Sequence, residues 1–346
     1  MFNFLDATQP LVQNGNPRFG HFADALSRLD RNGFDYRNPF GDKQNPLSRW
    51  IGCKDFQYLG GMSDRLIFGC ALAHLRYMGI AFVYVYDVTT RNLWSRSWKS
   101  PLGVGLTLAD NPLAGDSRFH LPGLVDIAMS YNTNPRDKTL TIRCKGLHLE
   151  ARMPEEHFRP MSICTRTGYS GWTYACKSAG QPLFGFLDWQ GEHFDLGDLK
   201  PHGHHDFSCG YMRRETWWNW ACLSGEIREG KYAGRRVGLN ISAGVNETGF
   251  SENCYWLDGQ LFPLHFTRFD FDSRQPLQPW DIEADHGALR LSFTPLGMHH
   301  ERIRTGLVNS NFRQVFGEFR GALRHEGETL SLDGLKGFVE DQYIKW

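Results

Sequence analysis

Neither sign of charge is in excess in this sequence of 346 residues. Lysine and arginine together number 38, and aspartate and glutamate also number 38, so the formal net charge is zero. Proteins that bind nucleic acid must neutralise phosphates, so they carry a basic surface or basic runs. No lysine or arginine run stands out locally here. The charge balance therefore argues against a nucleic-acid partner.

Paired cysteines and long apolar runs are also missing. The eight cysteines are scattered without a CxxC pair, a spacing that favours buried free thiols over a zinc ribbon or a disulfide scaffold. The first twenty residues lack a basic segment followed by an apolar one, so we expect no signal peptide. The longest apolar stretches, such as GIAFVYVY at 79–86, are too short to cross a bilayer as a helix. We expect a reduced, cytoplasmic protein without an integral membrane segment.

Helical periodicity is scarce, and so are nucleotide and hydrolase motifs. The one good helix candidate is FGHFADALSRLD at 19–30, because its apolar residues recur at spacings of three and four. We expect it to form a short helix in an N-terminal arm. No GxGxxG follows a strand, and neither GxxxxGK[ST] nor GxSxG occurs, so common nucleotide-binding and serine-hydrolase sites lack support.

Short strands dominate the rest of the chain. Segments such as LIFGCALAH, IAFVYVYDV, LTIRCKG, GWTYACKS and VGLNIS are aromatic or aliphatic and are mostly bounded by turn residues. This pattern predicts an all-β protein of antiparallel barrels or sandwiches. Because the length exceeds what one core usually serves, we expect two units. The predicted divisions are an arm at 1–47, a first lipocalin-like barrel at 48–178 and a second at 179–346.

An ordered set of motifs resembles a bacterial family, domain of unknown function 2804. The motifs are GWTYACKSAGQPLFGFLDWQG, HHDFSCGYMRRETWWNWA, VGLNIS, SENCYWLDGQL, FGEFRG and GLKGFVEDQYIKW, and the resemblance runs from KDFQYLGG at 54 to Trp346. The overall plan is also similar to carotenoid 1,2-hydratase, to AttH-like double-lipocalin proteins and to lipocalin-like cyclases. That resemblance implies two consecutive lipocalin-type barrels with an apolar ligand between or inside them. It assigns no site residue, because the hydratase's functional residues cannot be matched here one by one.

The segment HGHHDFSCGYMRRETWWNWA at 202–221 gathers titratable and aromatic side chains. On an extended strand, His202, His204 and Asp206 would share one face, and His205 would point the other way. Two histidines and a carboxylate could hold zinc or iron. However, PHGHH begins with proline and glycine, which favours a solvated loop over a metal site. We therefore expect no metal and no other cofactor.

Polar residues recur inside the apolar strands of the second half. They are Asn240 in VGLNIS, Glu252 and Asn253 in SENCYW, and Glu340 in GFVEDQY. Because burying such groups costs several kcal/mol unless they are paired, we expect one network. It could be a structural pair, such as Arg214 with Glu252, that fixes the register of a barrel. It could also be the polar floor of an aromatic pocket, where desolvation raises a carboxyl pKa. The two are compatible.

Tryptophan is concentrated in the same half. In ETWWNWA, Trp218 and Trp220 share one face by the period of two, while Trp217 and Asn219 share the other, so we expect this strand to be covered on both faces. A barrel interior can hold one small ligand, and aromatic walls favour an apolar one. The predicted ligand-binding residues are Trp218, Asn219, Trp220, Asn240, Asn253 and Trp256.

Two classes of function remain open. The first is a cofactor-independent hydratase, isomerase or cyclase that acts on an apolar unsaturated lipid or isoprenoid. A protonated carboxyl group would supply a proton, His205 would activate water, and a tryptophan face would shield a cation. The predicted catalytic residues are His205, Asp206, Arg214, Glu252 and Glu340. The second class is a carrier or sensor of a hydrophobic small molecule. The number of titratable residues favours the enzyme.

Overall fold

The computed structural model describes residues 3–244, 249–304 and 308–346 and is almost entirely β. Its helices are α1 (Pro46–Gly52), α2 (Leu196–Leu199) and two 3-10 turns, Arg31–Gly33 and Asp285–Gly287. The all-β prediction is therefore confirmed.

The prediction of a helix at 19–30 was wrong. This segment contains the short strand β4 (Gly20–Phe22) followed by bends. Its apolar residues do pack on the main body, and Leu26 N donates to the hydroxyl of Tyr174 at 2.9 Å. Because these backbone groups find partners elsewhere in the protein, the segment is held extended despite its helical spacing.

Three large sheets contain nearly all the strands. In spatial order, the first sheet contains β1 (Phe4–Leu5), β4, β14 (Met161–Thr167), β15 (Gly171–Pro182), β18 (His202–Tyr211), β5 (Cys53–Met62), β6 (Leu66–His74), β7 (Met78–Asp87) and β8 (Asn92–Pro101). The second contains β17 (Glu192–Asp195), β16 (Phe184–Trp189), β13 (Leu147–Pro154), β12 (Arg136–Cys144), β11 (Val125–Thr133), β10 (Gly115–Leu121) and β9 (Leu106–Thr107).

The third sheet is built from the C-terminal part of the chain. In order, it contains β22 (Gln260–Pro263), β21 (Cys254–Leu257), β20 (Arg236–Ala243), β19 (Glu215–Glu226), β28 (Leu335–Lys345), β26 (Asn309–His325), β25 (Leu289–Arg304), β24 (Trp280–Ala284) and β23 (Thr267–Asp270), with β27 (Glu328–Ser331) paired to β26. A small hairpin joins β2 (Val12–Gln13) and β3 (Asn16–Pro17). Pairing within the three sheets is antiparallel except between β1 and β4.

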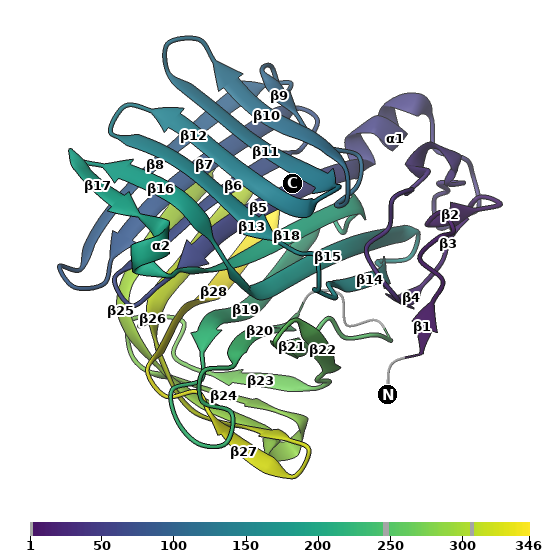
Figure 1. Ribbon diagram of the computed structural model, residues 1–346. Coiled ribbons are helices and arrows are strands. Elements are labelled where there is room, and N and C mark those ends of the chain that lie inside the picture. The colour runs from purple at the N-terminus through teal and green to yellow at the C-terminus, as the bar shows by residue number, and fades with distance from the viewer. Residues whose placement is uncertain (1–2, 245–248, 305–307) are drawn as a thin grey trace.

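The first sheet lies between the other two (Figure 1). One face of β5 to β7 packs on the second sheet around Phe68 and Phe119, and the other packs on the third sheet around Tyr84 and Phe316. The third sheet curls over a core of its own. Strands β15 and β18 are consequently buried on both faces along most of their length. Polar residues on these strands must find partners inside the protein.

The chain passes to the third sheet later than the predicted boundary between the two units. The expected boundary between 178 and 179 falls inside β15, and both β15 and β18 pair within the first sheet. The chain enters the third sheet at Glu215, after β18 ends at Tyr211. The central cavity described below lies at this crossing between the first and third sheets.

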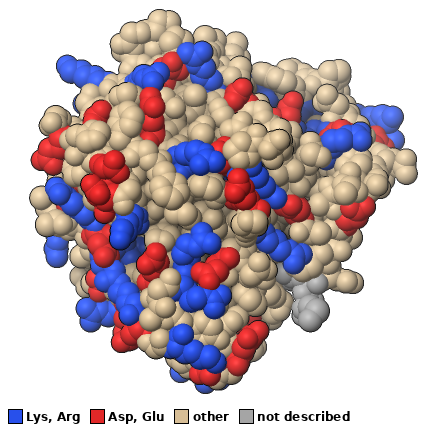
Figure 2. Space-filling view, viewed as in Figure 1, with Lys and Arg blue, Asp and Glu red and all other residues tan. Residues whose placement is uncertain are grey.

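The visible surface carries mixed charge. Figure 2 shows lysines and arginines interspersed with acidic residues on the face in view, as the zero net charge suggests. The eight cysteines are free, and all but Cys144 are buried. Within the described ranges, no helix has the length and apolar character needed to cross a membrane.

Candidate functional site

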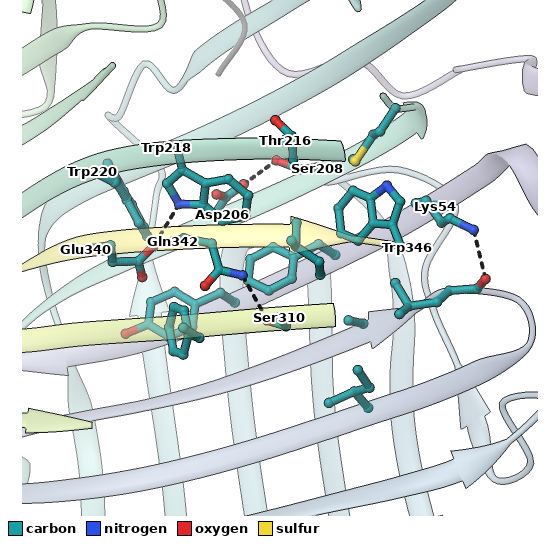
Figure 3. Close-up of a pocket in the computed structure, with 18 of the residues that line it drawn as sticks. Lys54, Asp206, Ser208, Thr216, Trp218, Trp220, Ser310, Glu340, Gln342 and Trp346 are labelled. Atoms are coloured by element: carbon teal, nitrogen blue, oxygen red, sulfur yellow. Dashed lines mark hydrogen bonds between the residues drawn. The ribbon is translucent and has the colours of Figure 1, made fainter. Parts of the chain in front are cut away.

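A cavity of about 190 Å³ lies between the first and third sheets. Its walls are mostly apolar, and aromatic side chains from both sheets contribute to them. They are Phe56, Tyr58, Phe82, Trp218, Trp220, Phe312 and Trp346. Figure 3 shows Trp220 and Glu340 toward one end of the cavity and Trp346 beside Lys54 toward the other. The cavity is smaller than the roughly 300–1,000 Å³ usual for drug-sized ligands, so it fits a small ligand or a slender chain.

Lys177 lies at the centre of a buried ionic cluster. It is directly opposite Asp206 in the register of β15 and β18. Its Nζ donates to Glu252 Oε1 at 2.7 Å and lies 3.3 Å from Asp206 Oδ2. The same ammonium lies over the ring of Trp220, 4.5 Å from its centroid. One lysine therefore balances two carboxylates beside an indole face.

Burial and charge act against each other in this cluster. Burial alone would lower the pKa of Lys177, but the carboxylates of Asp206 and Glu252 raise it overall, so the amine is charged. Burial raises the pKa of Asp206, and Lys177 opposes that rise. Ser208 Oγ donates to Asp206 Oδ1 at 2.6 Å and so fixes the orientation of the carboxylate. These contacts keep both charges of the pair in a region that excludes most water.

Glu340 is the acid whose chemistry is most altered by its surroundings. It sits on β28 with Trp220 and Gln314 as its register partners on either side. Trp218 Nε1 donates to its Oε2 at 3.0 Å, and Gln314 Nε2 donates to its Oε1 at 2.8 Å. Burial raises the pKa of Glu340 to about 7, even though both donors act to lower it. Near neutral pH this carboxyl group can therefore both donate and accept a proton.

Two acceptor atoms near Glu340 have no partner among the described residues. They are the Oε1 atoms of Gln314 and Gln342, both of which are buried and belong to side chains that line the cavity. Gln342 Nε2 donates to Ser310 Oγ at 3.2 Å, which fixes the direction of that amide. Buried acceptors are nearly always satisfied in proteins. A ligand hydroxyl or N–H group would suit this part of the wall.

Glu340→Gln is expected to remove a pH dependence of folding stability. Because the folded-state pKa of Glu340 is raised from 4.5 to about 7, its favourable contribution is full below about pH 4.5 and is lost as the pH rises to about 7. Relative to wild type, the variant should gain stability across that range, reaching on the order of 3 kcal/mol above it. Urea unfolding at several pH values measures this gain. A constant difference at all pH values would contradict it.

The structure brings five of the sequence-predicted residues to the cavity. They are Asp206, Glu252, Glu340, Trp218 and Trp220. Asn240 supports them from behind, because its Oδ1 accepts a hydrogen bond from Trp220 Nε1 at 2.8 Å and its Nδ2 donates to Glu252 O at 2.9 Å. Asn240 thereby links the orientation of the indole to the backbone at the ionic cluster.

Two predicted catalytic residues do not reach the cavity. His205 points to the opposite face of the first sheet, where its Nε2 is hydrogen-bonded to the hydroxyl of Tyr131 at 3.2 Å. Burial, reinforced by Lys138, lowers the pKa of His205 far below its usual value. Arg214 is exposed, and the ionic partner of Glu252 is Lys177 in place of Arg214. His205 and Arg214 therefore do not line this cavity, contrary to their predicted place in the site.

Besides Asn240, three predicted ligand-binding residues lie outside the cavity lining. Asn219 is on the other face of β19 from the two cavity tryptophans, and its Nδ2 donates to Glu340 O at 3.3 Å. Asn253 Nδ2 donates to His265 O at 2.7 Å, within the third sheet's own loops. Trp256 packs in the core between the sheets. These three residues therefore do not line the cavity. Trp217, on the same face of β19 as Asn219, is exposed, so the start of β19 is not covered on both faces as predicted.

The histidine-rich segment is a buried strand and not a solvated loop. His202, His204 and His205 all lie in β18, because the strand is hydrogen-bonded to β5 and β15 along its length. His204 Nε2 is hydrogen-bonded to the hydroxyl of Tyr58 at 2.9 Å, and burial lowers the pKa of His204 to about 3. No group of three or more potential metal ligands occurs within the described residues.

Sequence reasoning missed Lys177, Gln314 and Gln342. Lys177 had a usable signal, because it interrupts the apolar strand TYACKSAG, where a buried ammonium must have an acidic partner. Gln314 had none, since β26 becomes a neighbour of Glu340 only through the order of strands in the third sheet. Gln342 had one, because it follows Glu340 by two residues in the same strand and so shares its face.

Comparison with known proteins places the chain in a family. The family model described as domain of unknown function (DUF2804) matches residues 5–346. A search of curated proteins gives no match. A crystal structure described as an AttH of Nitrosomonas europaea has a TM-score of 0.49 at 14% identity, covering 83% of this chain and 92% of that one. Kievitone hydratase of Nectria haematococca has a TM-score of 0.48 at 11% identity, covering 83% and 88%. Because the family model spans nearly the whole chain, the protein belongs to the DUF2804 family.

Proposed function

We propose that this protein is a cofactor-independent acid–base enzyme that transfers a proton to carbon of a small apolar unsaturated ligand, as a hydratase, isomerase or cyclase does. The observation that carries the proposal is Glu340, a fully buried carboxyl group whose pKa is raised to about 7 in an aromatic-walled cavity. A general acid is most effective when its pKa lies near the working pH. A carboxyl group with a purely structural role gains nothing from a pKa near the working pH.

Protonation of a double bond by Glu340 begins the proposed reaction. The O–H of protonated Glu340 gives its proton to one carbon of a double bond, and the π electrons form the new C–H bond. The neighbouring carbon becomes electron-deficient, and a water oxygen forms a C–O bond to it. The water then returns a proton to Glu340, either directly or by way of the carboxylate of Asp206, so the acid is restored. In an isomerase, the carboxylate of Glu340 takes a different C–H proton, and the electrons of that C–H bond form the new double bond.

The surroundings of Glu340 suit a developing positive charge. Trp218 and Trp220 line the cavity beside the acid, and indole faces attract cations. The Lys177 cluster contains one ammonium and two carboxylates, so it adds net negative charge nearby. The apolar walls limit the access of competing water. These features support the proposal because they act on the charge-separated state more than on a neutral ligand.

The proposal is tested by recovery of bound ligand and incubation in deuterated water. Native mass spectrometry and solvent extraction of the purified protein should identify a small apolar compound. On incubation with wild-type protein, that compound should acquire carbon-bound deuterium or the elements of water. A compound recovered unchanged after long incubation, with binding intact, would overturn the enzyme and favour a carrier of the same ligand.

A further inference from the structure

The cavity end opposite Glu340 has a distinct composition. Lys54, Arg213 and Trp346 line it, and Trp346 Nε1 donates to Arg213 O at 2.8 Å. Figure 3 shows Lys54 beside Trp346, away from Glu340. Lys54 is four residues from Tyr58 on β5, and Tyr58 is the register partner of Asp206. At about 3.3 Å per residue, this end lies roughly 13 Å from the ionic cluster.

The Lys54 ammonium is buried without a carboxylate partner. Lys54 as a whole is only 5% exposed. Its Nζ donates to Ile51 O at 2.6 Å and Leu75 O at 3.0 Å and lies over the ring of Tyr77. An ammonium has three N–H donors, so one remains for another acceptor. No ion pair with Lys54 is formed by the residues that the structure describes, and a buried cation without a counter-ion is costly.

Arg213 adds a second cation at the same end. It is half-buried, and its guanidinium makes no hydrogen bond or ion pair to the described part of the chain. The nearby carboxylate of Asp55 is already bridged by Arg31 and Arg76. Asp55 is thus engaged, and Lys54 and Arg213, which both line the cavity, have no carboxylate partner among the described residues.

Glu301, another acidic residue that lines the cavity, is also engaged. Its Oε1 lies 3.0 Å from Lys99 Nζ. Burial, with the charge of Arg76 next in importance, lowers the pKa of Lys54 to about 8. The amine is therefore still mostly protonated at neutral pH, and a bound anion would raise its pKa. Charge and geometry at this end suit an acceptor with several oxygens.

We propose that Lys54 and Arg213 bind the anionic head group, a carboxylate or a phosphate, of an amphipathic ligand whose apolar chain extends toward Glu340. The inference uses the cavity of the proposed function, and it names the substrate class as an unsaturated chain ending in an anion. It also gives the ligand a direction: the head group lies at Lys54, and the unsaturated, reactive part of the chain lies near the side chain of Glu340. The small cavity volume restricts the chain to a short or slender one.

The test is calorimetric titration of the full-length protein with decanoic acid, decyl phosphate and 1-decanol. At least one of the anions should bind wild type about ten- to a hundredfold more tightly than the alcohol, the range expected for charge-assisted hydrogen bonds. The tighter of the two anions identifies the head group. Equal binding of the alcohol and both anions, or no binding of either anion, would overturn the inference.

Variants separate the head-group site from general effects on the fold. Lys54→Met and Arg213→Gln should each weaken anion binding about tenfold or more and leave 1-decanol within about twofold of wild type. Arg214→Gln is the matched control, because Arg214 is exposed and does not line the cavity. Equal loss for anion and alcohol in Arg213→Gln, the half-buried site most tolerant of change, would contradict the proposal.

The two proposals can fail separately. Anion binding that depends on Lys54, without turnover of any unsaturated acid, would leave the head-group site standing and remove the enzyme. Turnover of an uncharged compound that depends on Glu340, without binding of either anion, would do the reverse. Glu340→Gln is expected to retain the preference for the anion, since the carboxyl lies toward the other end of the cavity.

Discussion

Lys177→Met is expected to lower the free energy of unfolding by about 3–5 kcal/mol, the usual effect of removing one member of a buried ionic cluster. In the wild-type protein, Lys177 Nζ lies 3.3 Å from Asp206 Oδ2 and 2.7 Å from Glu252 Oε1. The variant leaves both side chains buried without this shared ammonium. The two carboxylates would also repel each other. Urea unfolding followed by the fluorescence of the eleven tryptophans measures the loss.

A rescue variant and a surface control make this prediction specific. Combining Lys177→Met with Asp206→Asn and Glu252→Gln should recover most of the loss, because no unpaired charge then remains buried. Lys231→Met is the control, since Lys231 pairs with Glu328 at 3.0 Å on the exposed surface, where such a pair contributes about 0–1 kcal/mol. A loss for Lys177→Met as small as that of the control would show that the cluster does not hold the sheets together.

Glu340→Gln is expected to reduce turnover of the recovered ligand by about a hundred- to ten-thousand-fold, the usual contribution of a positioned general acid. Glutamine has the same shape and can keep the hydrogen bond from Trp218, while the Gln314 amide can turn its oxygen toward the new NH₂ group. Ligand binding should therefore stay within a few-fold of wild type, because the acid acts in the transition state. Steady-state kinetics and calorimetry measure the two effects.

Companion variants distinguish chemistry from binding. Asp206→Asn should reduce turnover with little effect on affinity, whereas Trp220→Ala should weaken binding and turnover together, because it removes apolar contact from both states. His205→Ala and Glu215→Gln are controls, since His205 faces away from the cavity and Glu215 is an exposed residue at the start of β19. Undiminished turnover in Glu340→Gln would remove Glu340 from the mechanism.

The sequence was sufficient for the fold class and for most of the ionisable site. Alternating strands and turn residues predict β structure directly, and a carboxylate in an apolar strand implies a buried network wherever that strand lies. Glu252 and Glu340 were picked out in this way, and Asp206 came from the titratable segment 202–221; all three line the cavity. Which face each side chain occupies was harder, because it depends on where a strand begins. The proline and glycine before His204 suggested a loop, and the pairing of β18 with both neighbours made it a strand.

Long-range strand order accounts for most of what sequence reasoning could not supply. Lys177 and Glu252 are far apart in the chain and meet only because the third sheet packs on the first. Arg214 seemed a suitable partner for Glu252, but it comes just before β19 and is solvent-exposed. The N-terminal segment shows the same effect, since its helical spacing was overridden by contacts with the first sheet.

The protonation state of Glu340 is the central claim, and infrared difference spectroscopy across pH tests it most directly. Wild-type protein should show the carbonyl stretch of a protonated carboxylic acid that disappears with a midpoint at about pH 7, because burial raises the pKa of this group. The band should be missing in Glu340→Gln and retained in Glu215→Gln. If no band is lost in Glu340→Gln, or if the band that is lost titrates near the ordinary glutamate pKa of about 4.3, Glu340 is not a neutral acid in the folded protein and the proposed mechanism is wrong.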